Sequence, residues 1–232
     1  MKKKISVLGD SISTLQGYNP PDYKCFYRQA MCGIRDMHDT WWGRVIDYYD
    51  GSFLMNDSWA GSRVTCLVDA GSMFPSACSK ERTQNLHFQT EFPDAIFIYM
   101  GTNDWLEGVP LKTGEVRHFS GFPELVFETA YRLMLKRVKR NYPMARIICI
   151  PIIPSFIPED VNYTFPLSVY GCGYMEFNEV IRKEAQMIGA TYADATGQGK
   201  LYESFDGVHP DMKGMKTIAE LIIGGIGGSS FI

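Results

Sequence analysis

Short apolar runs alternate with longer amphipathic segments along the whole chain. Some runs, such as residues 95–100, are hydrophobic at almost every position, which is typical of strands covered on both faces of a parallel sheet. Turn-forming glycines, Gly9 and Gly101, end two of the runs. The pattern predicts five strands, at residues 5–8, 52–56, 95–100, 145–150 and 191–193.

Four longer segments carry the signals of helices. Asp39 or Thr40 can cap the first, and basic residues crowd the end of the second, where the helix dipole favours positive charge. Because strands and helices alternate, the chain is predicted to form an α/β fold, with helices on both faces of a parallel sheet. The helical segments are residues 41–49, 123–141, 174–188 and 211–223, and the Gly-rich end beyond them is expected to fray.

The composition is that of an ordinary folded chain. It has 232 residues, of which 45% are hydrophobic and 21% charged, and its formal net charge is −3. This length, without repeats or linker-like stretches, predicts a single domain over residues 1–232. The near-neutral net charge shows no excess of Lys and Arg that would attract nucleic acid or anionic lipid. We therefore expect neither nucleic acid nor a membrane as partner. No apolar run approaches the ~20 residues that a membrane helix needs.

The cysteines and the N-terminus bear on disulfides, metal binding and cellular location. Six cysteines are too sparse for a disulfide scaffold, and none belongs to a CxxC pair, so we expect no metal. The lysines at residues 2–4 resemble the start of a signal peptide. The apolar run that follows them ends at Gly9, however, and is too short for the core of such a peptide. The sequence therefore predicts a cytoplasmic protein.

Small polar residues gather where the predicted strands end. Ser11 follows the first strand, Gly61 the second and Asn103 the third, while Asp206 and His209 follow the fifth. In open parallel sheets, ligands bind outside the carboxyl ends of the strands, so these residues could meet in one site. Ser11 could be a nucleophile, His209 its base and Asp206 the group that orients the imidazole. Gly61 and Asn103 could offer N–H donors to an oxyanion.

The motifs that carry these residues resemble those of the SGNH hydrolases, also called the GDSL esterase/lipase family. They are Gly9-Asp10-Ser11, Gly61, Gly101-Thr102-Asn103-Asp104 and Asp206-Gly207-Val208-His209. One such motif is a weak signal, but four in order at predicted strand ends are specific, and they span nearly the whole chain. The resemblance implies a three-layer, flavodoxin-like fold that needs no cofactor or metal. It also implies a triad of Ser11, Asp206 and His209, with oxyanion donors at Ser11, Gly61 and Asn103.

Two features depart from the family's pattern. Ser58 stands where many members have the first glycine of a turn, although the donor position, Gly61, is kept. Residues 17–40 form a long insertion after the nucleophile, with an open role. Asp10 and Asp104 are expected to brace the turns by hydrogen bonds, and a carboxylate metal site is the alternative interpretation of this pair.

Trp59 and Trp105 each lie within two residues of an oxyanion donor. They could line the substrate pocket or pack in the core. The aromatic stretch at residues 155–173 could likewise form a pocket wall or a packed connection. Taken together, these features predict a serine esterase that acts on a small-molecule ester, with an acetyl or short acyl group on a carbohydrate or small alcohol. The alternatives are a thioesterase or lysophospholipase with the same triad, and a catalytically silent carbohydrate-binding domain.

Overall fold

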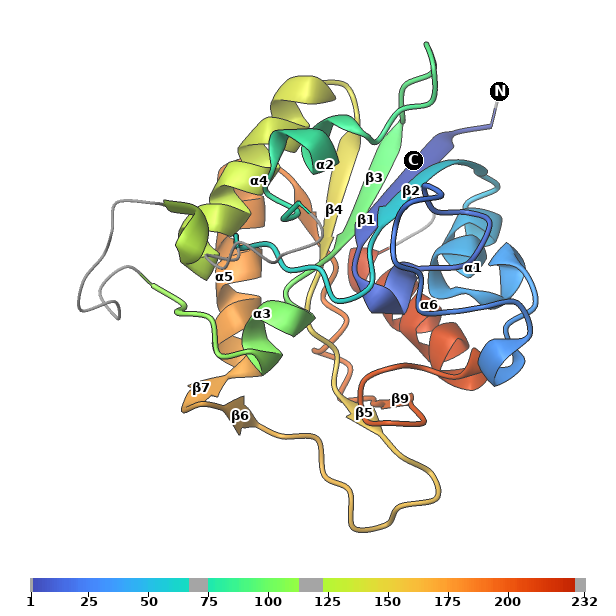
Figure 1. Ribbon diagram of the computed structural model, residues 1–232, viewed down its shortest axis with the longest axis vertical. Helices are drawn as coiled ribbons and strands as arrows, with labels where there is room; N and C mark the ends of the chain where they lie inside the picture. Colours follow the sequence, from blue (N-terminus) through green and yellow to red (C-terminus); the bar gives the residue numbers. More distant parts are fainter. Residues whose placement is uncertain (1, 67–74, 113–122, 228–232) are drawn as a thin grey trace.

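A five-stranded sheet in which every strand is parallel to its neighbours forms the centre of the molecule (Figure 1). The computed structural model describes residues 2–66, 75–112 and 123–227. The strand order β2-β1-β3-β4-β8 is that of flavodoxin-like folds, which confirms the predicted fold class. The strands are β1 (Lys4–Gly9), β2 (Ser52–Ser58), β3 (Ala95–Tyr99), β4 (Arg146–Ile150) and β8 (Thr191–Tyr192).

Helices cover both faces of this sheet and enclose two separate cores (Figure 1). One face carries α1 (Trp41–Tyr48) and α6 (Met212–Ile226). The opposite face carries α2 (Lys80–Gln84), α4 (Phe127–Asn141) and α5 (Tyr174–Met187).

Alternate residues of the central strands enter the two cores. In β3, Phe97 points into the core beneath α1 and α6, while Ile96 and Ile98 point into the core beneath α4 and α5. Both sets of side chains are therefore buried, because each face of the sheet is covered. This explains why residues 95–100 are hydrophobic without the alternation of a half-exposed strand.

The helix ends follow local hydrogen bonding. Thr40 caps α1 by accepting a hydrogen bond from the Gly43 N–H at 3.0 Å. The segment predicted as one helix from residue 123 begins with a short 3-10 turn, Pro123–Leu125, and the α-helix starts at Phe127.

Helix α6 continues beyond its predicted end at residue 223, through two glycines to Ile226. Gly225 packs so closely on Asp194 that an added Cβ would lie 2.6 Å from the Asp194 carbonyl carbon. The Asp194 N–H also donates to the Gly225 carbonyl at 3.1 Å. Docking on the segment after β8 thus holds a helix end that sequence propensity alone would leave frayed. None of the helices in the described ranges is long and apolar enough to cross a bilayer.

Smaller elements gather beyond the carboxyl ends of the central strands (Figure 1). Helix α3 (Thr102–Leu106) follows β3 directly. The parallel pair β5 (Ser155–Phe156) and β9 (Tyr202–Glu203) and the antiparallel pair β6 (Ser168–Val169) and β7 (Cys172–Gly173) lie within or beside the stretch at residues 155–173. Besides the turn before α4, the described residues form 3-10 turns at Ser11–Ser13, Met31–Gly33 and Met37–Asp39.

Candidate active site

Ser11 begins a 3-10 turn at the carboxyl end of β1. Asp10 caps this turn, because its Oδ1 accepts a hydrogen bond from the Ile12 N–H at 3.0 Å. A Cβ on Gly9 would come within 2.4 Å of the Ser13 hydroxyl and 2.8 Å of the Ser58 hydroxyl, so the chain can pass here only as glycine. The passage from strand to turn is thereby fixed tightly. Asp10 braces the turn, as the sequence predicts.

The loop after β9 brings His209 to Ser11, 198 residues away in the sequence. His209 Nε2 lies 2.9 Å from Ser11 Oγ, and His209 Nδ1 lies 2.6 Å from Asp206 Oδ2. A carboxylate accepts only, so the proton must lie on Nδ1, which leaves Nε2 to accept a hydrogen bond from the Ser11 hydroxyl. The three predicted triad residues therefore form one continuous hydrogen-bonded line.

The Asp206 carboxylate also organises its own loop. Its Oδ1 accepts hydrogen bonds from the backbone N–H groups of Val208, at 2.9 Å, and His209, at 2.7 Å. Burial alone would raise the pKa of Asp206, but the bonds from the imidazole and the two backbone donors outweigh it and lower the pKa from its usual value. Asp206 is therefore charged at neutral pH, as an orienting group for an imidazole must be.

Three hydroxyl groups, two of them from the stretch at residues 155–173, fix the backbone of this loop. The Ser155 and Tyr163 hydroxyls both donate to the Gly207 carbonyl, at 2.6 and 3.0 Å. The Tyr202 hydroxyl donates to the Val208 carbonyl at 2.6 Å. The long stretch at residues 155–173 thus packs against the histidine loop and supports it. Of the two interpretations of this stretch, the structure therefore favours a packed connection over an aromatic pocket wall.

Gly61 lies on the loop after β2, which is held from two sides. On one side, the Trp59 N–H donates to the Gly9 carbonyl at 3.2 Å. On the other, the buried Asp104 carboxylate accepts hydrogen bonds from the Val64 N–H at 2.8 Å and from the N–H and hydroxyl of Thr65 at 3.0 and 2.7 Å. Asp104 therefore braces the loop that carries Gly61, as the sequence predicts.

Each of the three predicted oxyanion donors has an N–H group that could bind an oxyanion. Gly61 is exposed and has a φ of +81°, a conformation that favours glycine. Its N–H and that of Ser11 find no acceptor within the described part of the chain. Asn103, in α3, uses its Nδ2 to donate to the Ser62 carbonyl at 2.9 Å. The second Nδ2 hydrogen of Asn103 stays available, because an amide nitrogen carries two.

The two carboxylates for which a metal site was the alternative are engaged with the protein instead. Asp10 binds the Ile12 N–H, and Asp104 binds Val64 and Thr65. Within residues 2–66, 75–112 and 123–227, no three acidic, histidine or cysteine side chains gather in a way that could hold a metal ion.

The structure favours one of the two alternatives for the tryptophans. Trp105 is 1% exposed, its Nε1 donates to the Cys172 carbonyl at 3.1 Å, and its ring stacks on Phe165. Of the two interpretations of Trp105, these contacts favour packing in the core over a place in the substrate pocket, because the segment before α5 covers its ring. Trp59 is 8% exposed and packs against Tyr23, with ring centroids 4.0 Å apart. Because both tryptophans are buried, their indole rings do not offer two open faces to an acyl group.

The aromatic surface near the triad comes instead from residues that the sequence pattern did not single out. The insertion at residues 17–40 contributes Phe26, which stacks on the His209 ring, and Tyr23, whose ring packs at a tilt against Trp59. The Lys24 carbonyl between them accepts a hydrogen bond from the Ala60 N–H at 2.8 Å, next to Gly61. The cluster of aromatic residues in the insertion was a signal for this role, but it did not indicate which ring reaches which loop.

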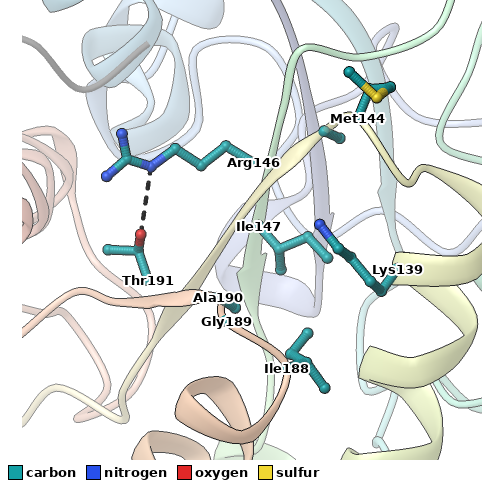
Figure 2. Close-up of a pocket in the computed structure, with 9 residues that line it drawn as sticks. Lys139, Met144, Arg146, Ile147, Ile188, Gly189, Ala190 and Thr191 are labelled. Carbon is teal, nitrogen blue, oxygen red and sulfur yellow. Dashed lines mark hydrogen bonds between the residues drawn. The ribbon is translucent and has the colours of Figure 1, made fainter.

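A separate pocket lies at the opposite edge of the sheet (Figure 2). It opens where β4 and β8 begin, between the end of α4 and the turn after α5, and Arg146 Nε donates to Thr191 Oγ1 beside it at 3.4 Å. Ligands of such sheets bind at the carboxyl ends of the strands. This pocket lies at their amino ends and contains none of the triad residues.

The chain is similar to several known proteins in sequence or in fold. The family model for GDSL-like lipase/acylhydrolase matches residues 3–166. A protein assigned as a GDSL-like lipase from Bacteroides ovatus has a similar structure, with a TM-score of 0.71 and 25% sequence identity over 96% of this chain and 97% of its own. A second such protein, from Bacteroides uniformis, gives a TM-score of 0.70 and 24% identity over 97% and 95% of the two chains.

A family two carbohydrate esterase from Clostridium thermocellum shares the fold more distantly. Its TM-score is 0.58 and its identity 18%, over 97% of this chain and 63% of its own. No curated protein sequence matches this chain.

The fold and these comparisons define a hydrolase of the esterase or acylhydrolase type. The chain belongs to the GDSL-like lipase/acylhydrolase family, since the family model covers well over half of it. The resemblance to the SGNH hydrolases is thereby confirmed.

Proposed function

We propose that this protein hydrolyses carboxylic esters through an acyl-enzyme formed on Ser11. The observation that carries the proposal is the unbroken line of hydrogen bonds from Ser11 Oγ through both nitrogens of His209 to Asp206. Two segments meet along that line, the turn after β1 and the loop after β9, and Ser11 and His209 are 198 residues apart in the sequence. A silent binding domain has no need of it, so the geometry favours catalysis over the carbohydrate-binding alternative.

In the first half of the reaction, His209 Nε2 takes the Ser11 proton as Oγ attacks the ester carbonyl. The negative charge that develops on the carbonyl oxygen is met by the N–H groups of Ser11 and Gly61 and by the free amide hydrogen of Asn103. Asp206 stays charged and stabilises the imidazolium that forms. His209 then gives its proton to the leaving alcohol oxygen as the ester C–O bond breaks.

In the second half, water replaces the alcohol. His209 Nε2 takes a proton from the water as its oxygen attacks the acyl carbonyl, and the same donors stabilise the second oxyanion. Collapse of this intermediate returns the proton to Ser11 Oγ and releases the carboxylic acid. The hydroxyl groups that pin the histidine loop keep the imidazole in place through both halves.

The substrate that we propose has a short acyl group on a polar alcohol such as a carbohydrate. The site is open: Gly61 is exposed, and the side chains of Asp206 and His209 are 39% and 17% exposed. A hydrated alcohol suits such a site, whereas a long acyl chain gains about 0.8 kcal/mol per methylene only where it is buried. The shared fold with a carbohydrate esterase adds support. A thioesterase or lysophospholipase would use the same residues on a different ester.

Substitution of the nucleophile tests the reaction. Ser11→Ala should abolish covalent labelling by a fluorophosphonate and nearly all hydrolysis of p-nitrophenyl acetate, because no other group in the line can form the acyl-enzyme. Ser76→Ala is a matched control, since Ser76 contacts Cys66 and Cys78 and takes no part in the triad. Turnover by Ser11→Ala at the wild-type rate, with an unchanged circular dichroism spectrum, would exclude the proposed function.

A further inference from the structure

The Phe26 ring lies flat against the imidazole of His209. The two ring centroids are 3.6 Å apart and the planes are inclined by only 6°. Phe205 is almost parallel to both rings, but its centroid is 6.1 Å from each, so it lies to the side. One face of the imidazole is therefore covered by Phe26, a residue of the insertion at residues 17–40.

Hydrogen bonds tie Phe26 to the nucleophile turn. Its backbone N–H donates to Thr14 Oγ1 at 2.9 Å, and the Thr14 hydroxyl donates in turn to the Ser11 carbonyl at 2.9 Å. The next residue, Tyr27, is fully buried, and its hydroxyl donates to the Pro210 carbonyl at 2.8 Å. The Phe26 backbone thus lies between two anchors, one beside Ser11 and one beside His209. Its ring position is set by the same loops that carry the reacting groups.

The hydrogen bond to Asp206 does not by itself prevent the imidazole ring from tilting. Asp206 holds the ring only at Nδ1, and its own side chain is 39% exposed. A hydrogen bond at one edge limits sliding of the ring but permits it to tilt about that bond. A second ring in full face contact opposes the tilt, and so keeps Nε2 directed at Ser11 Oγ.

The same contact acts differently on the two charge states of His209. A cation over an aromatic face is attracted by the ring's quadrupole, whereas a neutral imidazole gains only stacking. His209 becomes a cation when it takes the Ser11 proton, on the way to the transition state. An interaction that strengthens at that moment raises kcat and leaves KM almost unchanged.

We propose that Phe26 is a positioning residue of the hydrolytic reaction, which holds the His209 imidazole by its face and favours its protonated form as the acyl-enzyme is made and broken. This inference rests on the proposed function of Ser11 and His209. It assigns a role to the insertion at residues 17–40, which the family's motifs leave without one.

The test compares variants of the full-length protein on p-nitrophenyl acetate. Phe26→Leu keeps an apolar side chain but removes the aromatic face, and should lower kcat by about three- to thirty-fold with KM within a factor of two. Phe26→Tyr and Phe26→Trp keep the face and should stay within about two-fold of the wild-type kcat. The rate of fluorophosphonate labelling of Ser11 should fall in parallel with kcat in Phe26→Leu only.

Tyr18→Leu is the matched control, because Tyr18 lies in the same insertion but packs edge-on against Trp42 and Phe53, away from His209. It should leave kcat unchanged while lowering the melting temperature to a similar or greater extent. If Phe26→Leu melts as wild type does and still loses kcat, loosening of the fold is not the cause.

Three results would overturn the proposal. The first is a Phe26→Leu kcat equal to wild type, the second is an effect confined to KM, and the third is a Phe26→Tyr variant as slow as Phe26→Leu. Each of these leaves the proposed function standing, provided that Ser11→Ala is inactive. Activity in Ser11→Ala would instead reject the function itself.

Discussion

Asp10 is a buried carboxylate one residue before Ser11, and only half of it is satisfied. Its Oδ1 caps the turn, whereas its Oδ2 is buried with no hydrogen-bond partner among the described residues. Burial raises the pKa of Asp10 to about 7, against the lowering effects of the Ile12 N–H and the Arg82 guanidinium. The nucleophile turn is therefore held by a group that costs stability when it is charged.

This arrangement gives a stability that depends on pH. Between about pH 4 and pH 7 the folded state keeps a proton on Asp10 that the unfolded chain has lost, so the free energy of unfolding falls as the pH rises through this range. The loss is complete above about pH 7 and is of the order of 4 kcal/mol at most.

Asp10→Asn removes the ionisation while keeping an oxygen for the Ile12 N–H. The variant should be more stable than wild type at pH 8 and close to it at pH 5, as measured by urea unfolding at both values. Asp22→Asn, at an exposed position, is the control and should leave the free energy of unfolding unchanged at both pH values. An Asp10→Asn variant that is less stable than wild type at pH 8 would contradict this account.

Asn103 is the second residue whose role can be isolated. Loss of one oxyanion donor typically costs about 10²–10³ in kcat, because the interaction strengthens only in the transition state. Asn103→Ala should lower kcat by that factor and change KM little, in steady-state kinetics on p-nitrophenyl acetate. A rise in KM at unchanged kcat would show that Asn103 binds substrate and is not an oxyanion donor.

At the scale of elements, a buried ion pair links α2 to the ends of the first two strands. Arg82 and Asp57 are both 0% exposed, and Arg82 Nε donates to Asp57 Oδ2 at 2.5 Å. Arg82 Nη2 also donates to the carbonyls of Asp57 and Gly9, at 2.6 and 3.2 Å. One side chain from α2 thus organises the point where the nucleophile turn leaves β1.

Removal of Arg82 should therefore destabilise the fold severely. Arg82→Met leaves Asp57 buried without its cation, which typically costs about 3–5 kcal/mol. Arg182→Met is the matched control: Arg182 pairs with Glu179 at the surface, where solvent screens the two charges, so its loss should change the free energy of unfolding little. Urea unfolding at pH 7 measures both. Equal stability of the two variants would mean that the buried pair does not support the strand ends.

At the scale of the whole molecule, five separate segments converge on one edge of the sheet. They are the turn after β1, the insertion that follows it, the loop after β2, α3, and the loop after β9 (Figure 1). Parallel topology places all carboxyl ends of the strands on the same side. Each crossover helix leads the chain back to the start of the next strand, so that the next loop also reaches this edge. The resulting site lies between loops, and its exposed groups favour an ester with a polar alcohol.

Chain-length preference tests this conclusion. Across p-nitrophenyl esters from acetate to palmitate, kcat/KM should be highest for acetate or another short acyl group and should decline as the chain lengthens. A panel of acetylated sugars should then include better substrates than the nitrophenyl ester. A maximum at long chains would reject the short-acyl proposal and favour a lysophospholipase.

Local patterns in the sequence were sufficient to predict the sheet and to place the candidate site residues at its edge. Continuous hydrophobic runs predict the central strands, because alternate residues of each strand are buried in different cores. The motifs at Ser11, Gly61 and Asn103 follow the ends of the first three central strands, so parallel topology brings them to one edge. His209 lies on the loop after β9, outside the central sheet, and its local signal is the spacing of three residues from Asp206. These features are readable because each is encoded within a few neighbouring residues.

Tertiary contacts decided the rest. Trp105 is covered by the segment before α5, α6 is prolonged by docking on Asp194, and Phe26 meets His209 across most of the chain length. In each case the partner is distant in the sequence, and neither residue carries a local signal of the other. Hydrophobicity predicts that an aromatic ring will be buried, but only the packed structure determines whether it is buried in the core or against the imidazole of the triad.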